Sequence, residues 1–217
     1  LPNFCGVFHS YEVAGTRYYT GFAWNTPQKF GKPGEDDVGP ESRVTLSEAT
    51  FTLSGDKPDR PWVLKGVEPW IGAIGAYGTA PDVDGKRKPV EHRTAAGKLV
   101  LAVPTRSFSN GTSVEGYEIL VFNPDYETSE DGQVWASAGT VNTGEDNSAA
   151  CDDGAVMPCI SNQGTLSFSA VPGSDLPAIT VAATGTTIDA PGQTRALGAS
   201  DARRYYYDAA RKAYVAQ

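Results

Sequence analysis

The chain has 217 residues, a size typical of one large all-β domain, and its 40% hydrophobic residues are enough to form a core. No apolar run approaches the roughly 18 residues that a membrane-spanning helix needs, so we expect no membrane insertion. Eighteen Lys and Arg stand against twenty-six Asp and Glu, which gives a net charge of −8. Only two histidines are present, which restricts histidine-dependent catalysis.

The charge is unevenly distributed along the sequence. Residues 107–194 contain twelve Asp or Glu and no Lys, Arg or His. The remaining residues contain eighteen bases and fourteen acids, a net charge of +4. An acidic segment of this size repels phosphate backbones, so we expect no nucleic-acid partner.

Alternating apolar and polar residues predict strands in the N-terminal part at 5–13, 16–24 and 43–53. The segment 25–41 contains three Pro and three Gly, which predicts a long loop. Within 43–53 the apolar parity changes after Leu46, and this predicts a bulge near Ser47–Glu48.

Two Pro-Trp pairs predict the starts of two further strands, 61–67 and 69–77. The segment 80–89 is polar and is expected to be an exposed loop. One or two helical turns are the best interpretation of 90–97, since no long segment of the chain has a helical period.

The second half predicts strands at 98–104, 114–122, 133–139, 165–171 and 178–184, and a weaker one at 186–190. Asn110-Gly111 predicts a hairpin turn in preference to a glycosylation site, although Asn110-Gly111-Thr112 is also a sequon. The segment 140–153 is polar, and we expect it to be mobile.

The chain closes with three adjacent tyrosines, and we interpret this end as a hairpin in which 203–207 pairs with 213–216. Tyr205 and Tyr207 would then face one side of the strand, and Arg204 and Tyr206 the other. A helix is the alternative, but tyrosines at three successive positions would give it no apolar stripe.

About a dozen short antiparallel strands separated by long polar loops predict an all-β fold, either a β-sandwich or jelly roll or a β-barrel. The chain begins at Leu1-Pro2 and not at Met. We therefore expect residues 1–217 to be a single all-β domain excised from a longer precursor.

The three cysteines predict one disulfide. Cys151 and Cys159 bracket a nine-residue loop that a bond would stiffen, which leaves Cys5 free or paired outside the chain. A disulfide together with the acidic composition favours an oxidising compartment. We expect the protein to be extracellular, on a cell surface or on the surface of a virion.

No catalytic residues are expected from the histidines, because the sequence has no Gly-x-Ser-x-Gly motif and neither His9 nor His92 has a catalytic context. If the protein is an enzyme, Glu115 and Glu118 are the best pair of carboxylates. Glu118 shares a face with apolar neighbours, so it is either a partly buried carboxyl or, as we favour, a charge on an edge strand.

Acidic turns make calcium the most plausible ion, but we expect no metal site and no cofactor. The stretch 82–85, Asp-Val-Asp-Gly, begins like an EF-hand loop, yet its twelfth position is Arg93 and not Glu. Acidic turns are most often ordinary turns, in which Asp and Asn cap the backbone.

The expected ligand-binding residues are two aromatics beside polar loops and two residues of the closing hairpin: Trp24, Tyr126, Arg204 and Tyr206. The leading hypothesis is a non-enzymatic recognition or adhesion module, similar in composition to viral capsid spikes and lectins, that binds a glycan or a protein receptor. The first alternative is a secreted β-sandwich polysaccharide hydrolase or lyase with paired carboxylates. The second is a structural subunit of an extracellular filament or coat, in which exposed strand edges would form a homo-oligomer.

Overall fold

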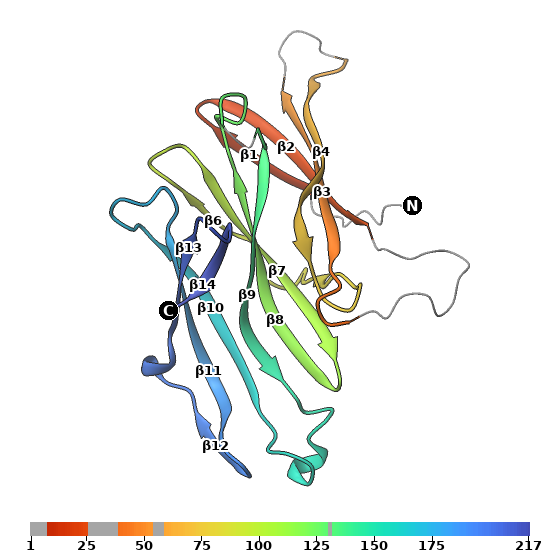
Figure 1. Cartoon of the computed structure of the whole chain (residues 1–217), viewed down its shortest axis with the longest axis vertical. Helices are drawn as coiled ribbons and strands as arrows, with labels where there is room; N and C mark the ends of the chain where they lie inside the picture. The colour runs from red at the N-terminus through yellow and green to blue at the C-terminus, as the bar shows by residue number, and fades with distance from the viewer. Residues whose placement is uncertain (1–7, 26–38, 54–58, 130–131) are drawn as a thin grey trace, which may run out of the picture.

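The structure is a computed structural model that describes residues 8–25, 39–53, 59–129 and 132–217. In these residues fourteen strands form two antiparallel sheets, and the only helical segments are two short 3-10 turns (Figure 1). The predicted all-β fold is confirmed, and its two sheets are consistent with a sandwich. No helix in the described residues has the length and hydrophobicity to cross a bilayer.

The smaller sheet has four strands in the order β1-β2-β3-β4. These are β1 (Phe8–Val13), β2 (Thr16–Asn25), β3 (Val44–Leu53) and β4 (Trp62–Ile74). The predicted strands 16–24 and 43–53 are therefore confirmed, as is 5–13 from Phe8 onward. Cys5 and most of the predicted loop 25–41 lie outside the described residues.

The larger sheet has the order β14-β13-β11-β10-β9-β8-β7-β5, with β6 also paired to β7 and β12 to β11. Its strands are β5 (Asp82–Val83), β6 (Val90–Arg93), β7 (Leu99–Ser109), β8 (Thr112–Phe122), β9 (Trp135–Asp146), β10 (Ser161–Ser169), β11 (Ala178–Ala190), β12 (Gln193–Ala196), β13 (Arg203–Asp208) and β14 (Ala213–Ala216). Figure 1 shows β7–β9, in yellow-green to green, between the four-stranded sheet and the blue strands β10–β14.

The central position of β7 explains why its sequence begins with a continuous apolar run. Residues 99–105 are all buried, because the strand has a hydrophobic core on each face. Leu99 and Leu101 belong to the core shared with the four-stranded sheet. Val100 and Ala102 belong to a second core, shared with β10, β11, β13 and β14.

The first core consists of Tyr11, Val13, Phe22, Val44, Leu46, Ile71, Ile74, Leu99, Leu101, Val103, Leu120, Phe122, Val134 and Trp135. The second consists of Val100, Ala102, Tyr117, Ile119, Ala138, Val141, Leu166, Leu176, Ile179, Val181, Tyr205 and Tyr214. The larger sheet therefore curls, since β8 and β9 share the second core with β11, β13 and β14.

A chain of buried polar groups crosses the first core. Trp135 Nε1 donates to Tyr11 Oη and to Thr20 Oγ1, at 3.2 Å each. Thr20 Oγ1 is hydrogen-bonded to Thr50 Oγ1 at 2.7 Å, and Thr50 donates to Glu48 Oε2 at 2.5 Å. Burial raises the pKa of Glu48 to about 7, so this carboxyl becomes largely protonated as the pH falls below neutral.

The bulge predicted near Ser47–Glu48 is present, but its cause differs from the one expected. The β3–β4 register shifts between Leu46, which pairs with Gly72, and Glu48, which pairs with Glu68. The extra residues are therefore in β4. On β3 the buried face continues through Glu48 and Thr50, so the apolar parity misjudged which residues face the core.

Other expected boundaries are corrected by the structure. The two strands predicted at 61–67 and 69–77 are one irregular strand, β4, and 186–190 is the end of β11. The helical turn expected at 90–97 is instead the short strand β6, because Val90–Arg93 pairs with the edge of β7. The first half of the polar stretch expected to be mobile, up to Asp146, is the end of β9, paired with β8.

Both predicted hairpins are confirmed. Asn110 and Gly111 have φ angles of 51° and 76°, the pair of positive values that a two-residue hairpin turn needs, and they join β7 to β8. At the C-terminus β13 pairs with β14, and Tyr205 packs into the second core. Arg204 on the same strand is exposed, as the alternation predicts.

Candidate functional site

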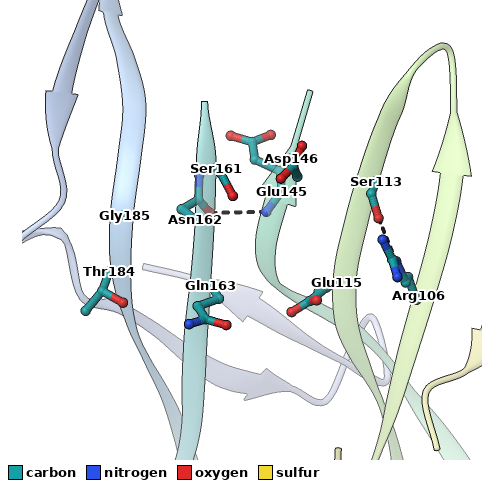
Figure 2. A pocket seen from close by; sticks show the side chains of 10 residues that line it. All are labelled: Arg106, Ser113, Glu115, Glu145, Asp146, Ser161, Asn162, Gln163, Thr184 and Gly185. Atoms are coloured by element: carbon teal, nitrogen blue, oxygen red, sulfur yellow. Dashed lines mark hydrogen bonds between the residues drawn. The ribbon is translucent and has the colours of Figure 1, made fainter. Parts of the chain in front are cut away.

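A polar groove of about 310 Å³ lies on the larger sheet, where five neighbouring strands meet the turns at one end (Figure 2). Its lining consists only of polar side chains and one glycine. The residues are Arg106, Ser113, Glu115, Glu145, Asp146, Ser161, Asn162, Gln163, Thr184 and Gly185. They come from β7, β8, β9, β10 and β11, so rigid paired strands position them.

One wall of the groove is the β7–β8 hairpin. Arg106 pairs with Glu115 across the two strands, which places both side chains on the same face. Arg106 Nε donates to Ser113 Oγ at 2.8 Å, and this bond fixes the guanidinium along the wall (Figure 2). The groove therefore has a positioned donor next to a carboxylate acceptor.

The other wall depends on the pairing of β9 with β10, which is limited to Asp146 with Ser161 and Glu145 with Asn162. Asn162 Oδ1 accepts from the Glu145 backbone N–H at 3.1 Å, and its Nδ2 donates to Thr186 O at 3.0 Å. Asn162 thus ties β9 to β11 across β10, and the groove lies between these strands.

Gly185 allows the strands to approach closely beside the groove. Its φ is +113°, and a Cβ there would lie 2.3 Å from the backbone oxygen of Ser161. Only glycine fits this position without moving β10 away from β11.

Hydrogen bonds to Ser148, then to Ser161, lower the pKa of Asp146, with Arg106 contributing through its charge. Asp146 is therefore an ionised acceptor at neutral pH. It is also the last residue before the turn that leads into the disulfide loop.

The disulfide predicted between Cys151 and Cys159 is present and closes the loop that joins β9 to β10. The base of this loop is held by Asn147, whose Oδ1 accepts from Ile160 N at 2.8 Å and whose Nδ2 donates to Pro158 O at 3.0 Å. Since Asp146 and Ser161 flank this base, the loop fixes one end of the groove.

Arg87 braces the groove from the loop before β6. Its guanidinium donates to Thr105 O at 2.6 Å and to Gly116 O at 3.1 Å, and it lies 4.9 Å from the centre of the Tyr117 ring. Gly116 is where the β8–β9 register shifts. Arg87 also approaches Glu115 to 3.9 Å, so it orients a groove carboxylate.

An exposed aromatic residue stands beside the groove. Phe108 is 68% exposed, and it pairs across the hairpin with Ser113, which lines the groove. Paired residues in antiparallel strands present their side chains on the same face. Sequence reasoning missed Phe108, although its position two residues after Arg106 and two before the Asn110-Gly111 turn predicts an exposed strand end.

Only one of the predicted site residues, Glu115, lines the groove. Glu118 lies on the opposite face of β8, where Ser137 Oγ and Thr140 Oγ1 donate to it at 2.5 and 2.7 Å. Burial raises the pKa of Glu118 to about 6. The structure therefore does not bring the two carboxylates together. The edge-strand interpretation of Glu118 is wrong, because β8 lies between β7 and β9.

The predicted ligand-binding residues are spread over the molecule. Trp24 and Tyr126 are partly buried and pack against the first core. Tyr126 also donates its hydroxyl to Glu127 Oε1 at 2.9 Å. Arg204 is exposed and Tyr206 is half-buried on β13, a strand that contributes nothing to the groove lining.

The histidines and acidic turns lie elsewhere. His9 Nε2 is 2.9 Å from Glu91 Oε1, and the His92 ring lies against Phe168, so each has a partner outside the groove. Among the described residues no group of three or more His, Cys, Asp or Glu is arranged to hold a metal ion.

Comparison with known proteins gives no assignment. No family model, no curated protein and no solved structure matches the chain. The chemistry of the groove is therefore the basis on which a function can be proposed.

Proposed function

We propose that the protein is a non-enzymatic recognition module, of the lectin-like or capsid-spike-like kind, that binds a glycan in the polar groove. The observation that carries this proposal is the combination of a fully polar lining with an exposed aromatic ring at its side. Sugars present many hydroxyl groups and weakly polar ring faces, so they need both features.

The lining offers both kinds of hydrogen-bonding partner. Carboxylates accept from hydroxyls, the Arg106 guanidinium donates, and the amides of Asn162 and Gln163 do both. Phe108 adds an apolar surface on which a sugar ring can stack. Because paired strands hold these groups, little conformational entropy is lost when a ligand binds.

The position of the perturbed carboxyls favours binding over hydrolysis. A glycosidase needs a general acid whose pKa is raised. The two glutamates with a raised pKa, Glu48 and Glu118, are buried between the sheets, where a polysaccharide has no access. In the groove the pKa of Asp146 is lowered, which suits a permanent acceptor.

The same proposal includes where the protein works, which is outside the cell. A disulfide persists in oxidising compartments, so its presence supports a protein that works outside the cell, on a cell surface or on a virion. A glycan receptor would be encountered in those places.

A glycan array tests this function with wild-type protein and two groove variants, Arg106→Ala and Phe108→Ala. We expect specific binding by the wild type and loss of most of the signal in both variants. Two matched controls are Arg204→Ala and Phe8→Ala, since these residues are an exposed arginine and an exposed aromatic outside the groove. Absence of any glycan binding, or turnover of a bound polysaccharide, would refute the proposal.

A second surface favours the alternative of a structural subunit that associates with itself. The outer face of the four-stranded sheet presents apolar side chains that are 39–60% exposed: Phe8, Leu53, Trp62, Leu64 and Val67. They follow the register of paired strands, in which Leu53 faces Trp62 and Ala49 faces Val67. A large exposed apolar face is typical of an association surface.

Light scattering over a concentration series tests this second function. The expected result is a mass that rises with concentration in the wild type and stays monomeric in Leu64→Glu and Val67→Glu. The matched control is Val156→Glu, an exposed valine in the disulfide loop. A wild type that remains monomeric at every concentration would eliminate a coat or filament role for this face.

A further inference from the structure

The four-stranded sheet touches the larger sheet where β4 lies against the beginning of β9. A Cβ at Gly66 would lie 3.2 Å from Val134 Cγ2, so the two segments are in close contact. Two residues further along β4, the Glu68 carboxylate accepts hydrogen bonds from Val134 N at 2.7 Å and from Trp135 N at 3.3 Å. Glu68 therefore joins the two sheets through the backbone at the start of β9.

A second carboxyl lies directly opposite Glu68. In the β3–β4 register Glu68 pairs with Glu48, which is only 3% exposed. Paired residues of antiparallel strands have neighbouring side chains on the same face, and two like charges there destabilise the pair. Within the residues that the structure describes, no Lys, Arg or His makes an ion pair with either carboxyl. The two groups are therefore ionised together only at a cost in free energy.

The surroundings of Glu48 favour its neutral form. Thr50 donates to Glu48 Oε2, whereas Glu48 Oε1 is buried and has no hydrogen-bond partner in the described part of the chain. Burial raises the pKa of Glu48 to about 7, and the charge of Glu68 acts in the same direction. Tyr11 of β1 is the other titratable member of the buried chain, and burial raises its pKa, so it stays neutral. The members on β2 and β9, Thr20 and Trp135, do not titrate.

Of the two carboxyls, that of Glu68 is the one able to move when both are ionised. Glu48 lies on β3, which is paired on one side with β2 and on the other with β4. Glu68 is half-buried, and the β3–β4 register shifts next to it. Rotation of Glu68 into water relieves the repulsion, but it removes the acceptor of two backbone N–H groups. Those two groups must then bind water, which separates the start of β9 from β4.

We propose that the Glu48–Glu68 pair is a proton-controlled latch between the two sheets. When Glu48 is protonated, the Glu68 carboxylate stays bonded to Val134 and Trp135 and holds the start of β9 against β4. When Glu48 is ionised, Glu68 turns to solvent and this contact opens. The latch is therefore closed in mildly acidic solution and opens as the pH rises above neutral.

A charged contact at the opposite edge of the four-stranded sheet responds to pH in the opposite direction. His9 of β1 lies 2.9 Å from Glu91 of β6. Burial outweighs the attraction of Glu91 and lowers the pKa of His9, so this contact loses stability as the pH falls. A weakening of the β4–β9 contact at high pH therefore does not come from His9.

Hydrogen–deuterium exchange of single amides, followed by NMR and corrected for intrinsic exchange rates, tests the latch at about pH 5 and about pH 8. The reporters are the amides of Val134 and Trp135, and protected amides of β10 and β11 report global unfolding. Between the two pH values we expect the protection of the reporters to fall about fivefold more than that of the β10–β11 amides. Repulsion between paired like charges sets this size.

Two variants assign the effect to the carboxyl pair. Glu48→Gln keeps the shape and removes the charge, so both reporters should stay equally protected at the two pH values. Glu68→Ala removes the acceptor, so both reporters should be weakly protected at the two pH values. The matched control is Glu118→Gln, because Glu118 is the other buried glutamate with a raised pKa and is bonded to Ser137 and Thr140. This control should lose reporter protection at high pH as the wild type does.

Selective loss of reporter protection in the wild type, absent in Glu48→Gln, supports the latch. Loss by the same factor at every amide would mean that pH acts only on global stability, and the latch would be refuted. Full protection of the reporters at high pH, or an unchanged loss in Glu48→Gln, refutes it as well. Glu68→Ala decides the question even if Glu48→Gln does not fold, since a selective loss at high pH that survives without Glu68 excludes the latch.

Discussion

The first core and the groove use the same residue types in opposite ways. In the first core Glu48, Thr50 and Thr20 form a buried chain of hydrogen bonds. In the groove Glu115, Asp146 and Thr184 lie on paired strands at the surface. Burial raises the pKa of Glu48, whereas hydrogen bonds lower that of Asp146. The comparison shows that access to water, and not residue type, separates the buried carboxyl of Glu48 from the ionised acceptor Asp146.

The largest effect should come from cutting the buried chain at Trp135. This side chain is fully buried, contacts Phe22 and Phe122, and donates to Tyr11 and Thr20. We expect Trp135→Ala to lower the free energy of unfolding by about 3–5 kcal/mol, from the cavity and the lost partners. Urea denaturation measures the change.

Trp135→Phe is the milder control for that experiment. It keeps most of the ring and removes the N–H, so we expect a loss of about 1 kcal/mol. If both variants lose the same free energy of unfolding, hydrogen bonding and not packing dominates the stability of this core.

The second effect is a dependence of stability on pH. Burial raises the pKa of Glu48 from 4.5 to about 7, so the folded protein holds this proton more tightly than the unfolded chain. The contribution to stability is full below pH 4.5 and is lost as the pH rises toward 7. At about 1.4 kcal/mol per pKa unit, we expect a loss of up to about 3 kcal/mol between pH 4.5 and pH 8.

The Glu48→Gln variant tests whether Glu48 causes this dependence of stability on pH. Denaturation midpoints over this pH range should change much less in the variant than in the wild type. A smaller slope of the same sign should remain from Glu118, whose pKa is about 6. An unchanged slope would mean that Glu48 is ionised in the folded protein at neutral pH.

The third effect concerns the disulfide at the end of the groove. For a nine-residue loop, loop-closure entropy predicts that Cys151→Ser with Cys159→Ser lowers the free energy of unfolding by about 2–3 kcal/mol. The same double variant should weaken ligand binding, because the loop base holds Asp146 next to Ser161. Thermal unfolding and titration with the same ligand separate the two results. If the double variant binds the ligand with unchanged affinity, strand pairing alone is enough to shape this end of the groove.

Local patterns predicted most of the strands and both hairpins. Alternation was enough at 16–24, where the apolar residues face one core. The Asn110-Gly111 turn was predictable because few dipeptides adopt two successive positive φ angles. The same reasoning failed for 90–93, since the free edge of β7 turns a short polar segment into a strand.

The interior polar chain could not be predicted from local sequence. Thr20, Thr50 and Trp135 are far apart in the chain, and each looks ordinary in its own strand. The buried face of β3 is decided by partners on β2 and β9, so the apolar pattern alone misjudged it.

The groove was predictable only in part. Glu115 was singled out from its acidic surroundings, but Gln163 and Thr184, which pair with each other, join it through the register of β10 with β9 and β11. A shift of one residue in that register would turn them to the other face. Long-range pairing of this kind leaves no signal in a single sequence.

The smallest effect on stability, and the sharpest division between the two regions, is expected at Phe108. This ring is largely exposed at the end of β7, so Phe108→Ala should change the free energy of unfolding by less than about 0.5 kcal/mol. Loss of a stacking surface should nevertheless weaken glycan binding about tenfold, which corresponds to about 1.4 kcal/mol. Phe122→Ala, in the first core, should do the reverse: it should cost several kcal/mol of stability and leave the groove lining in place. Paired measurements of unfolding and affinity on these two phenylalanines decide whether stability and recognition are carried by separate regions. If Phe108→Ala destabilises the fold as much as Phe122→Ala does, its ring belongs to the packing of the hairpin and not to the ligand site.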